Sequence, residues 1–235
     1  MAAIPFIWAA ALLPAVLLLV YILKKDKNPE PTGQLVKAML LGVATCIPAA
    51  LIEMAISWIF FGDSEGGSSL IGNIFDAFFV AAIPEECLKL LALWLVLRKN
   101  PYFNEHFDGI VYSVCVGLGF ATAENVLYLF DNMSDWASVA IGRAIFSVPG
   151  HYAFAVLMGY YYARYSFVES STKNLICILA VPVLAHGIYD AIVMNIGINE
   201  YLILPIFALL IFFCVMMHKK CKKKILAQLQ MDGTA

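Results

Sequence analysis

The residues of this sequence that could do chemistry lie inside apolar runs, at spacings that bring their side chains together on helical faces. Glu85, Glu86 and Lys89 form an EExxK pattern, in which a helical lysine can reach either carboxylate. His186 and Asp190 stand four residues apart and share one helical face. Two adjacent carboxylates in a nonpolar site cannot both be ionised cheaply, so either glutamate is a candidate general base for hydrolysis.

Two further segments add polar groups to this set. Glu124 lies within an apolar run, four residues after one aromatic residue and four before another. His151 directly follows Pro149 and Gly150, and we expect the helix to break there and aim backbone groups at the same site. Pro84 similarly removes a backbone hydrogen bond just before the two glutamates.

Composition indicates where this chemistry takes place. Of the 235 residues, 62% are hydrophobic and 14% are charged, which excludes an ordinary soluble domain, a disordered chain and a disulfide scaffold. The net charge of −2 argues against a nucleic-acid partner. The six cysteines show no CxxC spacing and are expected to be packing residues. The sequence therefore predicts an all-α, polytopic helix bundle in the lipid bilayer, forming a single integral membrane domain over residues 1–235.

About seven segments are long and apolar enough to span a bilayer: Ile4–Leu23, Met39–Phe61, Leu70–Leu97, Ile110–Phe130, Trp136–Tyr165, Leu175–Ile196 and Tyr201–Met217. All but two of the 15 lysines and arginines flank the same alternate ends of these segments. The opposite connections carry acids instead, namely Asp63, Glu65, Asp131, Asp135 and Glu200. The positive-inside rule then predicts an outside N-terminus and a cytoplasmic C-terminus.

Three of the chemical residues fall at one depth. Glu85, His151 and His186 each lie 13 residues from the basic residue that marks the cytoplasmic end of their segment. This corresponds to roughly 20 Å, a little beyond the middle of a core about 30 Å thick. Glu124 and Asp190 lie slightly nearer the outer side. A charge at mid-bilayer costs about 2.5–3.5 kcal/mol, so we expect these groups to meet around one hydrated cavity.

Other charged residues inside the segments are expected to have different roles. Asp76 and Arg143 lie toward the outer ends, where their side chains can extend to the interface. Glu53 matches no motif and is expected to be structural.

The motifs resemble those of the PrsW family of intramembrane proteases, which is grouped with the CAAX-prenyl protease and bacteriocin-processing superfamily. The resemblance rests on four patterns within residues 80–196: EExxK at Glu85–Lys89, FxxxEN with a tyrosine at Phe120–Tyr128, R…PxH at Arg143, Pro149 and His151, and HxxxD at His186–Asp190. Together these patterns cover roughly half of the chain. CAAX enzymes carry a histidine where this chain has Glu124, so prenyl-protein processing does not follow.

The resemblance implies a multi-pass endopeptidase of the bacterial inner membrane that cuts membrane-anchored proteins. The best-known role of the family is clipping the outer part of a membrane-anchored anti-sigma factor. The expected catalytic residues are Glu85, Glu86, Lys89, Glu124, His151, His186 and Asp190.

Two mechanisms and two other functions stay open at this point. A glutamate-activated water could act without metal, or a zinc ion could be held by residues drawn from Glu86, Glu124, His151, His186 and Asp190. No HExxH pattern is present to decide between these. A proton- or ion-coupled transporter could use the same buried groups, although no inverted repeat is visible. A membrane scaffold without catalysis is the remaining alternative.

Overall fold

The computed structural model describes residues 4–62 and 69–233, and this part of the chain is helical with no strand. Asp63 and Glu65, two of the acids expected in an outer connection, lie outside the described residues. The elements in chain order are α1 (Ile4–Leu23), α2 (Thr32–Phe61), α3 (Leu70–Phe75), η1 (Asp76–Ala82), α4 (Ile83–Leu97), α5 (His106–Asp131), α6 (Trp136–Gly142), η2 (Arg143–Ser147), α7 (Val148–Ala163), η3 (Arg164–Val168), α8 (Thr172–Met194), η4 (Glu200–Leu202) and α9 (Ile203–Met231).

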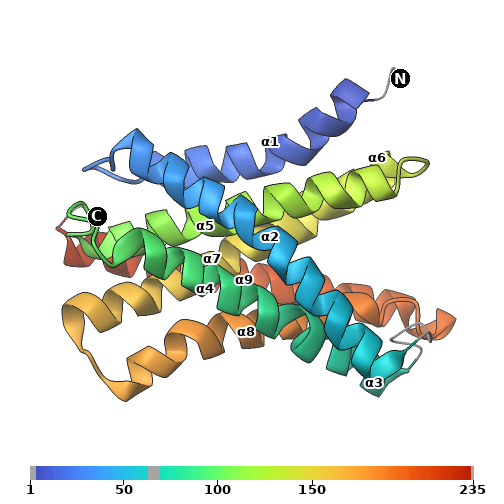
Figure 1. Cartoon of the computed structure of the whole chain (residues 1–235). Coiled ribbons are helices and arrows are strands. Elements are labelled where there is room, and N and C mark those ends of the chain that lie inside the picture. Colours follow the sequence, from blue (N-terminus) through green and yellow to red (C-terminus); the bar gives the residue numbers. More distant parts are fainter. Residues whose placement is uncertain (1–3, 63–68, 234–235) are drawn as a thin grey trace.

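The predicted polytopic helix bundle is confirmed. Within the described ranges, six helical segments are long and apolar enough to cross a membrane: Ile4–Leu23, Thr32–Phe61, His106–Asp131, Trp136–Val168, Thr172–Met194 and Glu200–Met231. The remaining expected segment, residues 70–97, is helical throughout but carries several charges, and it forms as α3, η1 and α4. Figure 1 shows this segment running back beside α2 toward the end of the bundle where α1 ends.

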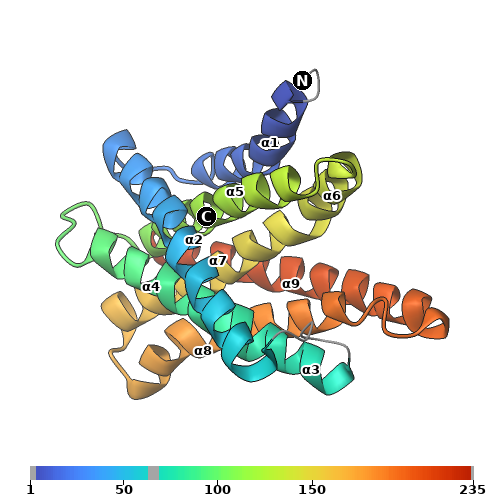
Figure 2. The ribbon, with the colours of Figure 1, turned by 45° about the vertical axis from the view of Figure 1, so that its right-hand side comes forward.

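The bundle is built around α5, whose residues are buried along most of its length. Both views place α1 at one edge and α8 at the opposite edge, with α5 and α7 between them (Figures 1 and 2). Small residues allow the central helices to approach closely. A Cβ at Gly159 of α7 would lie 2.2 Å from the Gly109 carbonyl oxygen of α5, so this crossing requires glycine.

Charged connections gather at one end of the bundle. Figure 1 shows the α1–α2 and α7–α8 connections, the end of α4 and the C-terminus at the same end, while the N-terminus lies at the other. The buried Glu30 carboxylate accepts a hydrogen bond from the Tyr112 hydroxyl of α5. Asp232, just after α9, accepts hydrogen bonds from the first backbone N–H groups of α5, those of His106 and Phe107, each at 2.9 Å. The C-terminal segment therefore caps the central helix.

The expected helix break at Pro149 is wrong. The chain passes from α6 through the π-helical turn η2 into α7, and Ser147 and Val148 keep helical dihedral angles. The π-helical turn η1 likewise precedes Pro84 in α4. A proline cannot donate to the residue four positions earlier, and a locally widened turn accommodates its ring without ending the helix. Both widened turns lie directly before residues of the candidate site.

Candidate active site

Three residues of α4 form the centre of a buried charged cluster. The Lys89 ammonium donates to Glu85 Oε2 and to Glu86 Oε1, each at 2.8 Å. It also lies 3.1 Å from His151 Nδ1 of α7. The ring of Phe120, from α5, lies 4.1 Å from the ammonium and adds a cation–π contact. All four of these polar residues are buried, so the contacts replace hydration that the charges lose.

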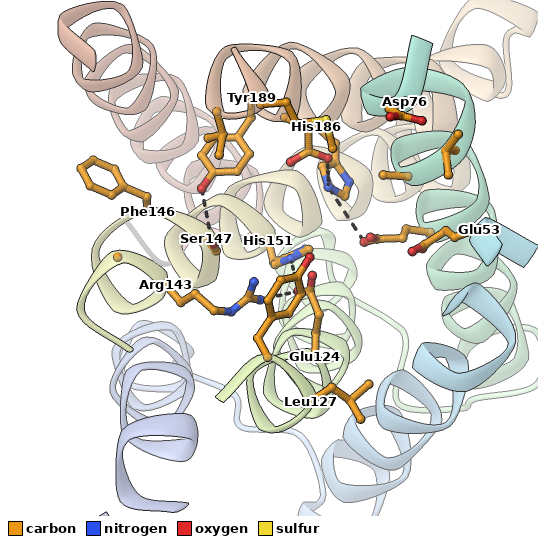
Figure 3. A pocket seen from close by; sticks show the side chains of 18 of the residues that line it. Glu53, Asp76, Glu124, Leu127, Arg143, Phe146, Ser147, His151, His186 and Tyr189 are labelled. Carbon is orange, nitrogen blue, oxygen red and sulfur yellow. Dashed lines mark hydrogen bonds and ion pairs between the residues drawn. The ribbon is translucent and has the colours of Figure 1, made fainter. Parts of the chain in front are cut away.

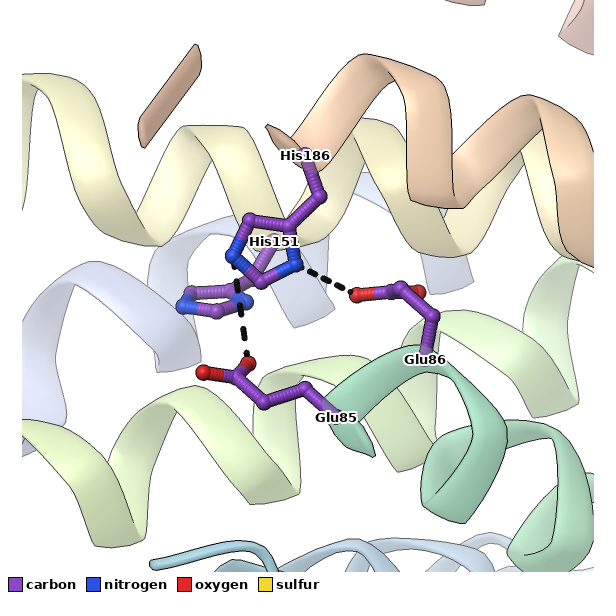
Figure 4. A group of neighbouring side chains, drawn as sticks. All are labelled: Glu85, Glu86, His151 and His186. Carbon is purple, nitrogen blue, oxygen red and sulfur yellow. Dashed lines mark hydrogen bonds and ion pairs between the residues drawn. The ribbon is translucent and has the colours of Figure 1, made fainter. Parts of the chain in front are cut away.

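His186 of α8 joins the cluster from the opposite side. Its Nδ1 lies 2.9 Å from Glu86 Oε1, and its Nε2 lies 3.1 Å from Asp190 Oδ2 and 3.9 Å from Glu85 Oε2. Figure 4 shows the two imidazoles facing the two α4 carboxylates. The ring of Phe154 stacks on His186 with centroids 4.7 Å apart and fixes its plane.

Glu124 of α5 connects His151 to a second cation. Its Oε2 lies 2.8 Å from His151 Nε2 and 2.6 Å from Arg143 Nη2. Arg143 also donates to the Asn125 side chain at 2.5 Å, and its guanidinium lies 4.1 Å from the Tyr128 ring centroid. The expected extension of Arg143 to the interface is therefore wrong: the side chain turns inward because a buried carboxylate and an amide oxygen are within its reach.

A cavity of about 940 Å³ opens beside this cluster, lined by residues of α2, η1 and α4 to α9. Glu85, Glu124, His151, His186, Asp190 and Arg143 line it, whereas among the described residues Glu86 and Lys89 lie behind its wall. The lining also includes Glu53 and Asp76, which the motifs did not place in the site (Figure 3). The only sequence signal for these two was an acid inside an apolar segment.

The expected convergence of these groups is observed, because acids of α4 and α5 meet imidazoles of α7 and α8. Within the described chain, one ligand atom from each of Glu85, Glu86, His151 and His186 lies within 4.8 Å of the others. Glu124 contacts Nε2 of His151, and Asp190 contacts Nε2 of His186. Each of these two carboxylates is therefore linked to the group of four by one contact with a histidine. Glu85, which was not an expected metal ligand, belongs to the group.

These donors fit a divalent metal such as zinc. Two carboxylates and two imidazoles are ligands that zinc accepts, and each histidine has a carboxylate on its far nitrogen, an arrangement typical of metal-binding histidines. Glu86 Oε2 is buried without a hydrogen-bond partner among the described residues, which leaves one acceptor at the cluster unsatisfied.

Comparison with known families identifies the family of this chain. Residues 30–217 match the family described as PrsW family intramembrane metalloprotease. The chain belongs to the PrsW family. It is therefore an intramembrane protease, a peptide hydrolase with several membrane-spanning helices, as the motifs predicted. Membership of the PrsW family does not favour the transporter alternative.

Several curated relatives support this assignment. The chain is 35% identical to Protease PrsW of Oceanobacillus iheyensis over 87% of this chain and 90% of the relative. It is 38% identical to Protease PrsW of Clostridioides difficile, over 78% and 77% of the two chains. The corresponding protein of Bacillus subtilis is 34% identical over 91% and 94%. No solved structure gives a significant match.

Proposed function

We propose that the cavity is the site where this protease hydrolyses a peptide bond of a membrane-anchored protein. The proposed functional residues are Glu85, Glu86, Lys89, Glu124, His151, His186 and Asp190. The observation that carries the proposal is the meeting of two carboxylates and two imidazoles from three helices beside one large cavity, which three of the four residues line. Peptide hydrolysis needs a base, hydrogen-bond donors for the oxyanion and a proton for the leaving amine. Carboxylates and imidazoles that meet in one site can supply all three.

The two glutamates have different surroundings and, we infer, different roles. Glu85 lines the cavity, so its carboxylate can reach a water beside a substrate. Glu86 is fully buried and is held by Lys89 and His186. We therefore assign the general base to Glu85 and a holding role to Glu86. The Lys89 ammonium contacts both carboxylates and offsets one unit of their negative charge.

The metal-dependent form of the mechanism is the one that the donor set favours. Glu86, His151 and His186 would hold a zinc ion, with Glu124 and Asp190 orienting the two imidazoles. When bound, zinc supplies Lewis acidity to the scissile carbonyl and activates water. The protein's own groups do the remaining work: Glu85 takes the proton from water and returns it to the leaving amine, and Arg143 at the cavity wall offers N–H donors to the developing oxyanion.

The direction of the cavity supports cleavage near the outer membrane surface. Its lining extends from Glu85 and His151 to Asn132 and Ile196, which follow the ends of α5 and α8 opposite the lysine-rich end. Under the positive-inside rule, the lysine-rich end is cytoplasmic and the N-terminus is outside. We infer a single protease domain over residues 1–235 in the bacterial inner membrane. An anti-sigma factor cut in its outer segment is a suitable substrate.

Co-expression with candidate single-span proteins, including anti-sigma factors, tests this function. Wild type should produce a fragment. Glu85→Gln should reduce its rate of formation by about 100-fold or more, in the range of lost acid–base catalysis, and Glu86→Gln should also reduce it because it removes a residue proposed to hold the metal. Glu200→Gln, at an exposed acid in a connection, is the matched control and should cleave normally. Normal cleavage by both active-site variants would refute the assignment.

A further inference from the structure

A second cavity lies on the outside of the bundle, between α7, α8 and α9, and is separate from the active-site cavity. Its volume is about 520 Å³. One part of its lining is apolar and includes Leu184 and Ile188 of α8, which are 55% and 42% exposed. The other part consists of Lys220, Lys223 and Lys224 of α9. We call this cavity the lysine groove.

The lysines occupy one end of the lysine groove. Lys224 lies eleven residues after Phe213, another lining residue, which is about 16 Å along a helix at about 1.5 Å per residue. This length is close to half of a hydrocarbon core about 30 Å thick, the depth of one leaflet. The groove is therefore apolar over about the length of one leaflet and basic where that leaflet meets water.

In the part of the chain that the structure describes, no acidic residue pairs with this basic end. Among the described residues, none of the ion pairs involves Lys220, Lys223 or Lys224. The Lys224 ammonium lies 3.6 Å from the Tyr160 ring centroid and 4.5 Å from that of Tyr161, which orients it without neutralising it. Lys220 and Lys223 are exposed.

We propose that the lysine groove binds one anionic glycerophospholipid, with its phosphate at Lys220, Lys223 and Lys224 and an acyl chain along Leu184 and Ile188. Charge complementarity selects the anionic headgroup, because a zwitterionic lipid lacks the net charge that three lysines attract. The apolar wall selects a lipid over a free phosphate, because a soluble anion leaves that wall uncovered. Leu184 and Ile188 flank His186, whose side chain faces the active-site cavity on the other side of α8 (Figure 3).

Native mass spectrometry of the full-length protein in neutral detergent tests the proposal. The protein is titrated with phosphatidylglycerol, phosphatidylcholine or glycerol phosphate. Wild type should retain one phosphatidylglycerol far more strongly than phosphatidylcholine, and glycerol phosphate should not displace it at equal concentration. Equal retention of the two lipids, or displacement by glycerol phosphate, would overturn the proposal.

Two pairs of variants locate the lipid. Lys220→Gln/Lys223→Gln should weaken phosphatidylglycerol binding about 25-fold, at about fivefold per lysine. The control Lys219→Gln/Lys222→Gln removes the same charge from exposed lysines that do not line the groove, and should weaken binding less than about threefold. An equal loss in both pairs would show a general surface attraction and would contradict a defined site.

The apolar wall is tested separately. Leu184→Trp should fill the groove and displace phosphatidylglycerol, whereas Leu175→Trp, at a 51% exposed leucine of α8 outside the groove, should retain it. Size-exclusion chromatography and circular dichroism confirm that each variant is folded. If the folded Leu184→Trp protein retains the lipid as wild type does, the acyl chain does not occupy the groove and the proposal is wrong.

Discussion

Replacing Lys89 by methionine removes the lysine ammonium from the active-site cluster while keeping a side chain of similar length. Lys89 is 3% exposed, and its ammonium lies 2.8 Å from a carboxylate oxygen of each of Glu85 and Glu86. Without the ammonium, the neighbouring carboxylates of Glu85 and Glu86 remain buried and lose the cation that pairs with them. Removing one partner of a buried ion pair costs about 3–5 kcal/mol.

This cost is measurable by thermal unfolding in neutral detergent. At about 2–4 °C per kcal/mol for a chain of this size, Lys89→Met should lower Tm by about 6–20 °C. Lys37→Met, at an exposed lysine of α2, is the matched control and should change Tm by less than about 2 °C. If the two variants unfold at the same temperature, Lys89 does not stabilise the buried carboxylates and the reasoning fails.

Zinc adds a second readout to the same variant. Lys89 contacts Glu85, Glu86 and His151, three of the four residues that form the candidate metal group, so the ammonium and a metal ion compete for the same atoms. Lys89→Met should therefore bind added zinc more tightly than wild type does, and at a concentration 100 times its own Kd the variant should gain about 2.7 kcal/mol of stability. Adding His186→Ala to Lys89→Met should remove this response. A zinc response that survives in the double variant would place the ion elsewhere.

Three further predictions concern the metal, pH and packing. Wild-type protein purified without chelator should contain about one zinc per chain by elemental analysis. Washing with a chelator should remove the zinc and abolish substrate cleavage. Full activity in metal-free protein would favour the glutamate-only mechanism. Burial raises the pKa of the Glu30 carboxyl above its ordinary value of 4.5, so the unfolded chain ionises first as pH rises. The contribution of Glu30 to stability is then fully present below pH 4.5 and is lost as pH rises through the raised pKa, and Glu30→Gln should reduce the fall in Tm between pH 4.5 and 8. Gly159→Ala should destabilise the protein by about 1–3 kcal/mol because the added Cβ meets the Gly109 backbone. The control Gly142→Ala has open space around it and should be neutral or stabilising by up to about 1 kcal/mol. Equal Tm values for the two variants would contradict the close packing of α5 and α7.

The sequence determined the membrane-spanning helices and the local side-chain groups of this protein. Apolar runs require helices in a bilayer, because only helices satisfy their own backbone hydrogen bonds there. Helical spacing alone then places Lys89 against Glu85 and Glu86, and His186 beside Asp190. Counting residues also predicted that the acids and imidazoles meet, since the rise per residue of a helix is fixed.

Only the tertiary structure decided how these local groups face one another. The rotation of each helix about its axis depends on packing between helices, such as the approach of α5 and α7 at Gly109 and Gly159. That packing turns Glu85 into the cavity and buries Glu86, and it pairs Arg143 with Glu124. Residue counts along one helix carry no information about these rotations, because a side chain's neighbours on other helices depend on where those helices cross.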